Sequence, residues 1–176
     1  LLCVNFTKLT QNYLQSHDIW LFIKLSLSTG ARMTSILNIK KKDIKLSTGT
    51  INIKDFKNNK TYQAYISDDE LFSYLESYIK TINLNAPLIS VKKKIIQTRL
   101  TPLLNRLFNN GLDKNDRKNR TVIHTLRHTF ASHLAINGTP IFTIQKLMNH
   151  KLIEMTMRYA HLAPDSGSHA VKNLYR

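Results

Sequence analysis

Residues 124–159 read HTLRHTFASHLAINGTPIFTIQKLMNHKLIEMTMRY, and the rest of the chain is organised around this segment. It opens an amphipathic helix in which His124 and Arg127 are one turn apart, so that an imidazole and a guanidinium share one face. A second histidine, His150, follows a Gly-Thr-Pro break and another helical stretch, and Tyr159 lies nine positions beyond it. Imidazole, guanidinium and phenol groups suit attack on a phosphodiester, provided that the rest of the chain supplies the missing groups.

The composition indicates a basic globular protein. The chain has 176 residues and is 42% hydrophobic, which is enough for one domain with a sizeable core. Its 26 Lys and Arg against 11 Asp and Glu give a formal net charge of +15, and nucleic acid is the leading candidate for a polyanionic partner. A basic surface without a specific partner is the alternative. A membrane surface is a weaker one, because the longest apolar run, residues 19–27, is interrupted by Lys24 and is too short to span a bilayer.

The cysteine content and the start of the chain add two expectations. A single cysteine, Cys3, excludes an intrachain disulfide and indicates a reducing compartment. The chain starts LLCVNF, without a methionine and without a basic-then-apolar leader, which predicts a piece of a longer protein.

The pattern of apolar residues predicts a mainly α fold with a small antiparallel β-sheet, in the α+β class. Residues 48–67 switch to period two and predict a hairpin, with Lys57-Asn58-Asn59-Lys60 as its turn and Lys57 and Lys60 at its projecting tip. Asp18 is expected to cap an apolar helix that ends at Gly30, and Asp68 or Asp69 to cap a later one. The other expected helices cover residues 7–17, 31–41, 94–109, 124–136, 140–148 and 153–159, and the tail forms one more short helix.

Arg32 is expected in the first turn of the helix that follows Gly30. A cation there opposes the positive end of the helix dipole, so its position makes sense if an anion is to be bound. An arginine that lies there by chance is the alternative interpretation.

Cleavage of a phosphodiester by a phenol needs a defined set of groups. Two arginines would clamp the non-bridging oxygens, a lysine on a mobile loop would protonate the 5′-oxygen, and a histidine would accept or orient the phenol proton. The tyrosine would then form a covalent phosphotyrosine ester, with no need for a metal or any other cofactor. The chain offers a candidate for each group: Arg32, Lys57, His124, Arg127, His150 and Tyr159.

The stretches TGARMTSIL, DFKNNK, HTLRHTFASHLA and MNHKLIEMTMRYAHL together resemble the catalytic domain of the tyrosine recombinases, the phage-integrase and Xer-like family. The resemblance covers residues 8–165 and implies a fold shared with type IB topoisomerases. It assigns the phosphate clamp to Arg32 and Arg127, and the general acid to Lys57, the first lysine of the hairpin. By the same resemblance His124 handles the proton or binds phosphate, His150 bonds the scissile phosphate, and Tyr159 is the nucleophile of a 3′-phosphotyrosyl link.

The chain departs from the family pattern at two positions. Ser35 stands where the family usually has an acidic residue that supports the first arginine, so Arg32 is expected to be held differently. Asn149 replaces the glycine of a Leu-Gly-His motif, and the turn can survive because asparagine tolerates a left-handed backbone.

The resemblance also implies how the whole protein is organised. Residues 1–176 would be a single catalytic domain, preceded in the full-length protein by a DNA-clamping domain. Four protomers would assemble on two double-stranded DNA sites, as a dimer on each, with the C-terminal tail docked on a neighbour. The protein would be cytoplasmic and associated with the nucleoid.

Three alternatives remain open at this point. One is a DNA-binding module that has lost catalysis, for which Ser35 and Asn149 are the best support, and another is a type IB topoisomerase. The third is a zinc site at His124 and His128, with His133 nearby, although the glutamate of HExxH and a cysteine cluster are missing.

Overall fold

The computed structural model describes residues 17–57, 59–66, 68–165 and 167–174. The chain divides into two compact units, Leu1–Phe130 and Ala131–Arg176. The helix expected over residues 7–17 lies outside the described residues apart from its last position, and Cys3 also lies outside them.

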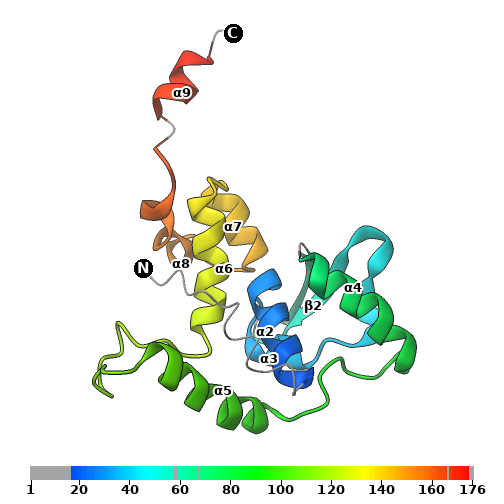
Figure 1. The fold of residues 1–176 in the computed structure, drawn as a ribbon. Helices are drawn as coiled ribbons and strands as arrows, with labels where there is room; N and C mark the ends of the chain where they lie inside the picture. Colours follow the sequence, from blue (N-terminus) through cyan, green and yellow to red (C-terminus); the bar gives the residue numbers. More distant parts are fainter. Residues whose placement is uncertain (1–16, 58, 67, 166, 175–176) are drawn as a thin grey trace. The chain divides into compact units, whose positions relative to one another are not determined.

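The core of the first unit is built around α2 (His17–Thr29), drawn in blue in Figure 1. Eight of its 13 residues are buried, as expected for a helix at the centre of a core. It contacts α3 (Met33–Leu37), α4 (Asp69–Tyr78), α5 (Lys93–Phe108) and strand β3 (Lys60–Tyr65). Its most deeply buried side chains are Ile19, Leu21, Phe22, Ile23 and Leu25.

Two predictions for the start of the chain are corrected by the structure. Asp18 is not a cap: it lies inside the first turn of α2, and its carboxylate accepts hydrogen bonds from the backbone N and the Oγ of Ser90 at 2.8 and 3.0 Å. The helix ends as predicted at Gly30, which has a left-handed φ of +60°. Arg32 then precedes α3 in extended conformation, with φ −70° and ψ 148°, so its expected place inside the first turn is wrong by one position.

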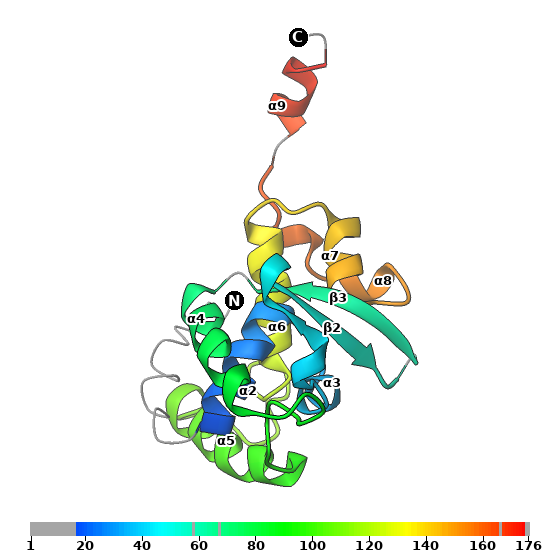
Figure 2. The same cartoon turned by 90° about the vertical axis from the view of Figure 1, so that its right-hand side faces the viewer.

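The predicted hairpin is confirmed and forms part of a three-stranded antiparallel sheet of order β1-β2-β3. Strand β1 (Ile44–Lys45), which the sequence did not predict, pairs with β2 (Thr50–Asp55), and β2 pairs with β3 (Figure 2). Ile51 faces Ala64 and Ile53 faces Tyr62 across β2 and β3. The turn contains Asn59 with φ +48°, as the asparagines there predicted.

Two hydrogen bonds fix the end of α5 to the segment that leads into α6 (Thr125–Ile136). The buried side chain of Asn109 donates to the backbone oxygen of Thr121 at 2.9 Å and accepts from its backbone N at 2.7 Å. The polar loop of residues 110–120 is therefore closed at its base, three residues before His124.

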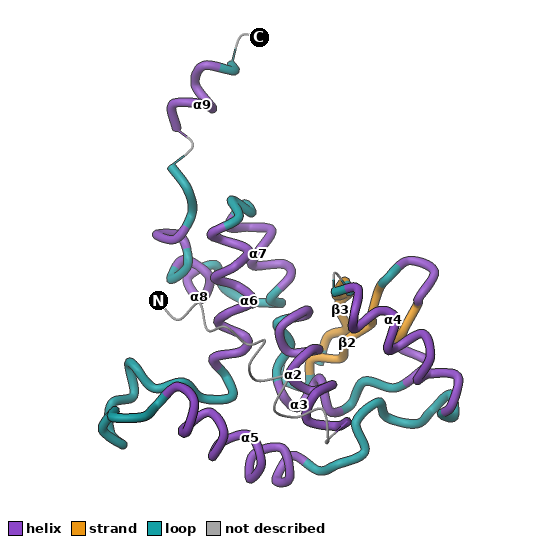
Figure 3. The backbone as a smooth tube through the Cα atoms, in the orientation of Figure 1, coloured by secondary structure: helices purple, strands orange, loops and turns teal. Residues whose placement is uncertain are grey.

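The second unit holds the last three helices of the described chain, after α6, which crosses the boundary between the units. They are α7 (Ile141–Leu147), α8 (Glu154–Met157) and α9 (Gly167–Lys172), with a 3-10 turn at Ala160–Leu162 (Figures 1 and 3). The helix expected over 153–159 is shorter than predicted, because Tyr159, at φ −100° and ψ −9°, lies between α8 and the 3-10 turn.

The described strands thus form one small sheet among helices, in agreement with the predicted fold class (Figure 3). Within the described residues, no helix has the length and apolar character needed to cross a membrane.

Candidate active site

Arg32 is held by a buried carboxylate of the sheet. Its Nη1 lies 2.7 Å from Oδ2 of Asp55, at the end of β2. Asp55 is 1% exposed, whereas 21% of the Arg32 side chain is exposed. The guanidinium is therefore fixed from the protein side and still reaches the surface.

The same aspartate fixes the start of the hairpin turn. Its Oδ1 accepts a hydrogen bond from the backbone N of Lys57 at 2.9 Å, while the Lys57 side chain is exposed. Asp55 thus connects Arg32 with Lys57, two of the six candidate catalytic residues.

Arg127 is 3% exposed and lies in the first half of α6. Its Nη1 donates a hydrogen bond to the backbone oxygen of Gly30, in the turn just before Arg32. A phenol from β3 is also close: burial raises the pKa of Tyr62, and the positive charge of Arg127 works to lower that pKa. The charges of Asp55 and Arg32 also act on Tyr62, so the charges of both arginines reach this residue of β3.

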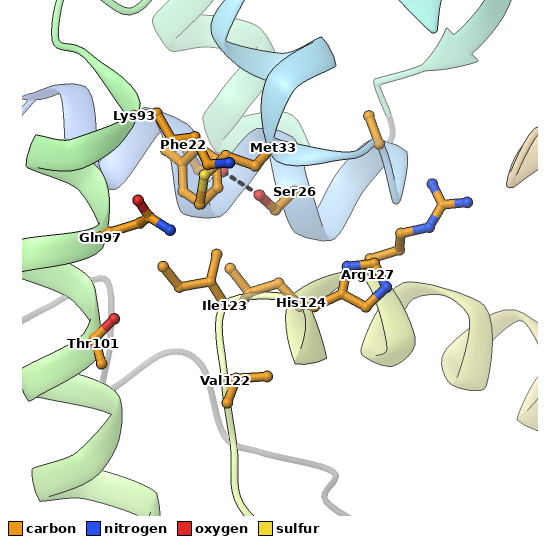
Figure 4. A pocket seen from close by; sticks show the side chains of 12 residues that line it. Phe22, Ser26, Met33, Lys93, Gln97, Thr101, Val122, Ile123, His124 and Arg127 are labelled. Atoms are coloured by element: carbon orange, nitrogen blue, oxygen red, sulfur yellow. Dashed lines mark hydrogen bonds between the residues drawn. The ribbon is translucent and has the colours of Figure 1, made fainter. Parts of the chain in front are cut away.

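His124 is exposed and comes directly before α6, where it lines a cavity of about 380 Å³ together with Arg127. Figure 4 shows the two side chains next to each other at the edge of this cavity. Lys93 and Gln97, one turn apart on α5, line another part of it. The rings of His124 and His128 meet edge to face with centroids 4.9 Å apart.

In the second unit, His150 is positioned by the end of α7. Asn149 has a φ of +47°, which confirms the left-handed turn predicted there. The backbone N of Asn149 donates to the oxygen of Lys146 at 3.0 Å, and that of His150 to the oxygen of Gln145 at 3.1 Å. This pattern is a Schellman motif, which ends a helix at a left-handed residue.

Thr156 connects His150 with Tyr159. Its Oγ1 lies 2.8 Å from Nδ1 of the His150 ring, and its backbone oxygen accepts a hydrogen bond from the Tyr159 N at 2.9 Å. Tyr159 is 5% exposed and Thr156 is fully buried. Within this unit, the His150 ring and the Tyr159 backbone are therefore both held by one threonine.

The structure brings Arg32, Lys57 and Arg127 together through Asp55, Gly30 and Tyr62, and His124 joins Arg127 at the cavity. His150 and Tyr159 form a second group in the other unit. The catalytic roles of all six residues stay predictions.

Sequence reasoning missed two residues of the first group, Asp55 and Tyr62. A signal for Asp55 was present, because it continues the period-two buried face of Ile51 and Ile53. A carboxylate at a buried strand position needs a cationic or hydrogen-bonding partner, and Arg32 provides it.

A metal site finds no support in the described part of the chain. Its His, Cys, Asp and Glu side chains form no group of three or more that could hold a metal ion. The histidine pair at the start of α6 is therefore not extended to a zinc site by His133 or by a carboxylate among these residues.

Comparisons with known sequences all point to one protein family. The model of the phage integrase family matches residues 5–166. The chain is 32% identical over 145 residues to tyrosine recombinase XerA of Saccharolobus solfataricus, across 82% of this chain and 46% of that protein. It is 30% identical over 151 residues to XerD of Staphylococcus saprophyticus, across 80% and 49%. The chain spans about half the length of these curated relatives.

Comparison with solved structures agrees. The catalytic domain of bacteriophage HP1 integrase superposes with a TM-score of 0.66 at 29% identity, over 89% of this chain and 82% of that one. XerH recombinase bound to difH substrate superposes with a TM-score of 0.62 at 24% identity, over 90% of this chain and 47% of that one, and bears on the fold alone. The fold is that of an integrase catalytic domain, as predicted.

Proposed function

The chain belongs to the phage integrase family, and we propose that it is the catalytic domain of a site-specific recombinase that cleaves and rejoins DNA through a 3′-phosphotyrosyl link. The observation that carries this proposal is the pair of anchored arginines. Arg32 is bonded to Asp55, Arg127 is bonded to the oxygen of Gly30, and the charges of both act on Tyr62. Two guanidiniums that converge in this way suit one phosphate group.

The proposed reaction begins with binding of a phosphodiester at Arg32 and Arg127. Guanidiniums fixed in advance stabilise the negative charge that grows on the non-bridging oxygens during attack, and they need no reorganisation at that moment. Because both cations are supplied by the chain, this step requires no metal ion.

Bond exchange would then involve Tyr159 and Lys57. The phenol oxygen attacks phosphorus, the bond to the 5′-oxygen breaks, and the exposed Lys57 ammonium gives that oxygen a proton. His124, beside Arg127, takes the phenol proton, and His150, oriented by Thr156, donates to the phosphate. Rejoining reverses these steps with a 5′-hydroxyl as nucleophile, and the phosphotyrosine bond conserves the energy of the broken link.

The buried state of Tyr159 adds a requirement. With 5% of its surface exposed, the side chain must move before its oxygen can reach a phosphate on DNA. The segment around it consists of short elements, the four-residue α8 and a 3-10 turn of three residues, which favours such a movement.

A DNA-binding module without catalysis is less well supported than an enzyme. Its main arguments were Ser35 and Asn149. Asp55 gives Arg32 a carboxylate despite Ser35, and Asn149 adopts a left-handed conformation at the end of α7. A type IB topoisomerase finds less support than a recombinase, because the relatives reported above are named recombinases and integrases.

We extend the proposal to the full-length protein. The two units would act as one catalytic domain, after an N-terminal DNA-clamping domain, on double-stranded DNA in the cytoplasm at the nucleoid. Four protomers would assemble on two sites. Val171 and Leu174, both 66% exposed, give the tail an apolar surface that could dock on a neighbour.

The test is a nicked suicide DNA substrate carrying the recombination site of this protein, incubated with the full-length protein and resolved on a denaturing gel. A covalent protein–DNA adduct is expected, and Tyr159→Phe should abolish it while leaving a gel shift. Tyr65→Phe is the matched control, because Tyr65 lies on β3 and is 53% exposed. Absence of an adduct despite a gel shift would contradict catalysis, and relaxation of supercoiled plasmid without the site would favour a topoisomerase.

A further inference from the structure

We propose that Asp55 is a positioning residue that couples the orientation of Arg32 to the location of the Lys57 hairpin, so that the phosphate clamp and the general acid are set together. This inference rests on the proposed function and assigns a role to a residue outside the six sequence-selected ones. The role is indirect, because Asp55 acts on the reaction through its two partners.

This role is supported by the geometry of Asp55, because each of its two carboxylate oxygens accepts a hydrogen bond. Oδ2 accepts from Nη1 of Arg32 at 2.7 Å, and Oδ1 accepts from the backbone N of Lys57 at 2.9 Å. Asp55 is 1% exposed, so water does not compete freely for either oxygen. A charge-assisted bond in such a place is stronger than one at the surface.

The strand explains why Asp55 cannot turn away. Asp55 is the last residue of β2 and pairs with Lys60, the first residue of β3, so its backbone is fixed by the hairpin. Period-two alternation places its side chain on the buried face with Ile51 and Ile53. Release of the Arg32 bond would take a charge-assisted hydrogen bond away from a buried carboxylate, which is costly.

Arg32 keeps capacity for a substrate in this arrangement. A guanidinium has about five N–H donors in a fixed fork, and the bond to Asp55 uses the Nη1 group. Its side chain is 21% exposed, which leaves a solvent-facing edge for a phosphate.

Support of Arg32 by Asp55 has a different effect from support by an acidic residue on α3. Position 35, where the sequence resemblance expected the acidic support, holds a buried serine, 3% exposed. A carboxylate there would hold Arg32 whatever the hairpin did. The carboxylate instead lies at Asp55, two residues before Lys57. If the hairpin is displaced, Arg32 therefore loses its hydrogen bond to Asp55, and Lys57 moves away from the site in the same step. The clamp and the acid therefore become competent together.

A purely structural role for Asp55 is the alternative, and substrates with altered chemistry separate the two. A methylphosphonate at the scissile position lacks one negative charge, so the clamp matters less. A 5′-sulfur leaving group departs without protonation, so the acid matters less. A general folding defect would slow cleavage of all substrates by the same factor.

The experiment measures single-turnover cleavage by the full-length protein, as wild type and as Asp55→Asn, on the natural, methylphosphonate and 5′-sulfur substrates. We expect Asp55→Asn to slow cleavage of the natural substrate by about 10²-fold, the loss typical of a misplaced reacting group, and by clearly smaller factors on each altered substrate. Asp43→Asn is the matched control, because Asp43 Oδ2 accepts a hydrogen bond from the backbone N of Lys40 at 2.9 Å, and Lys40 is not a catalytic candidate.

Two results would overturn the inference: wild-type rates for Asp55→Asn, or equal losses on all three substrates. Failure of wild type to cleave any substrate would instead reject the proposed function, so the two failures are distinguishable. Thermal unfolding of both variants shows whether the fold is retained.

Discussion

Lys57 combines a fixed backbone with an exposed side chain, which suits a group that must reach a substrate. If it is the general acid, Lys57→Ala should cleave a natural phosphodiester about 10²–10⁴-fold more slowly, the usual contribution of such a group. The defect should be much smaller on a 5′-sulfur substrate, whose leaving group needs no proton. Single-turnover rates on the two substrates measure this ratio.

Lys60→Ala is the control for that prediction. Lys60 is also exposed in the same hairpin, at the start of β3, and its loss should affect both substrates alike. A sulfur rescue for Lys60→Ala instead of Lys57→Ala would move the acid to the other lysine. Equal damage by Lys57→Ala on both substrates would contradict its role.

At the residue scale, the sequence was informative where side-chain type and spacing carry the chemistry. His124 and Arg127 needed only helical spacing to be paired. Asp55 and Tyr62 were missed because their importance comes from a tertiary contact: each is an ordinary strand residue until Arg32 or Arg127 is placed beside it. Period-two alternation along β2 was enough to predict that Asp55 is buried with Ile51 and Ile53, but no sequence pattern predicts the contact of Tyr62 with the arginines.

At the element scale, α4 begins at a cluster of three charges. Asp68 accepts from the backbone N of Leu71 at 2.9 Å and from Nζ of Lys24 at 2.8 Å, and Glu70 Oε2 lies 2.5 Å from the same Nζ. Burial works to raise the pKa of Asp68, but the bonds from Lys24 and Leu71 outweigh it and lower that pKa. Burial likewise works to lower the pKa of Lys24, and the two carboxylates raise it overall.

The pH dependence follows from these directions. A carboxyl group with a lowered folded pKa contributes stability above its ordinary pKa of about 3.9, and this stability is lost as the pH falls through the folded value. Lys24, with a raised pKa, contributes below its ordinary value and loses that contribution only at strongly alkaline pH. The cluster is therefore fully stabilising at neutral pH and weakens on the acid side through Asp68.

Asp68→Ala should lower the free energy of unfolding by about 1–2 kcal/mol at pH 7, because it removes a helix cap and an ion pair. Chemical denaturation should show the gap from wild type narrowing below about pH 4. Glu70→Ala is the control: its side chain is 62% exposed, so the loss should stay below about 1 kcal/mol. A larger loss for Glu70→Ala, or a gap that does not change with pH, would contradict this account.

Elements were predicted well where they are long or strongly patterned, and less well where they are short. The hairpin, α4 and α5 were expected almost as observed, because alternation and caps are local signals. The short strand β1 and the early end of α8 carry no such signal. Strand β1 has two residues and is defined by its pairing with β2, which is a tertiary property.

At the scale of the whole molecule, the dominant property is charge. The formal net charge of +15 follows directly from the sequence. The structure shows that one of the lysines that contribute to it lies beside the candidate site. Lys93 lines the same cavity as His124 and Arg127, one turn before Gln97 on α5 (Figure 4). If the proposed function holds, Lys93 is a candidate to contact a phosphate next to the scissile group.

DNA binding by the full-length protein should therefore weaken steeply with salt, because each neutralised phosphate releases condensed counterions. Fluorescence anisotropy at several salt concentrations gives the slope of log K against log [salt]. If Lys93 contacts a phosphate, Lys93→Ala should reduce that slope by about 1 and weaken binding to all sequences alike. Lys80→Ala is the matched control, since Lys80 is exposed after α4 and is not among the residues lining the cavity. An unchanged slope for Lys93→Ala, or an equal reduction for Lys80→Ala, would show that the charge acts as a diffuse field and not through a contact beside the candidate site.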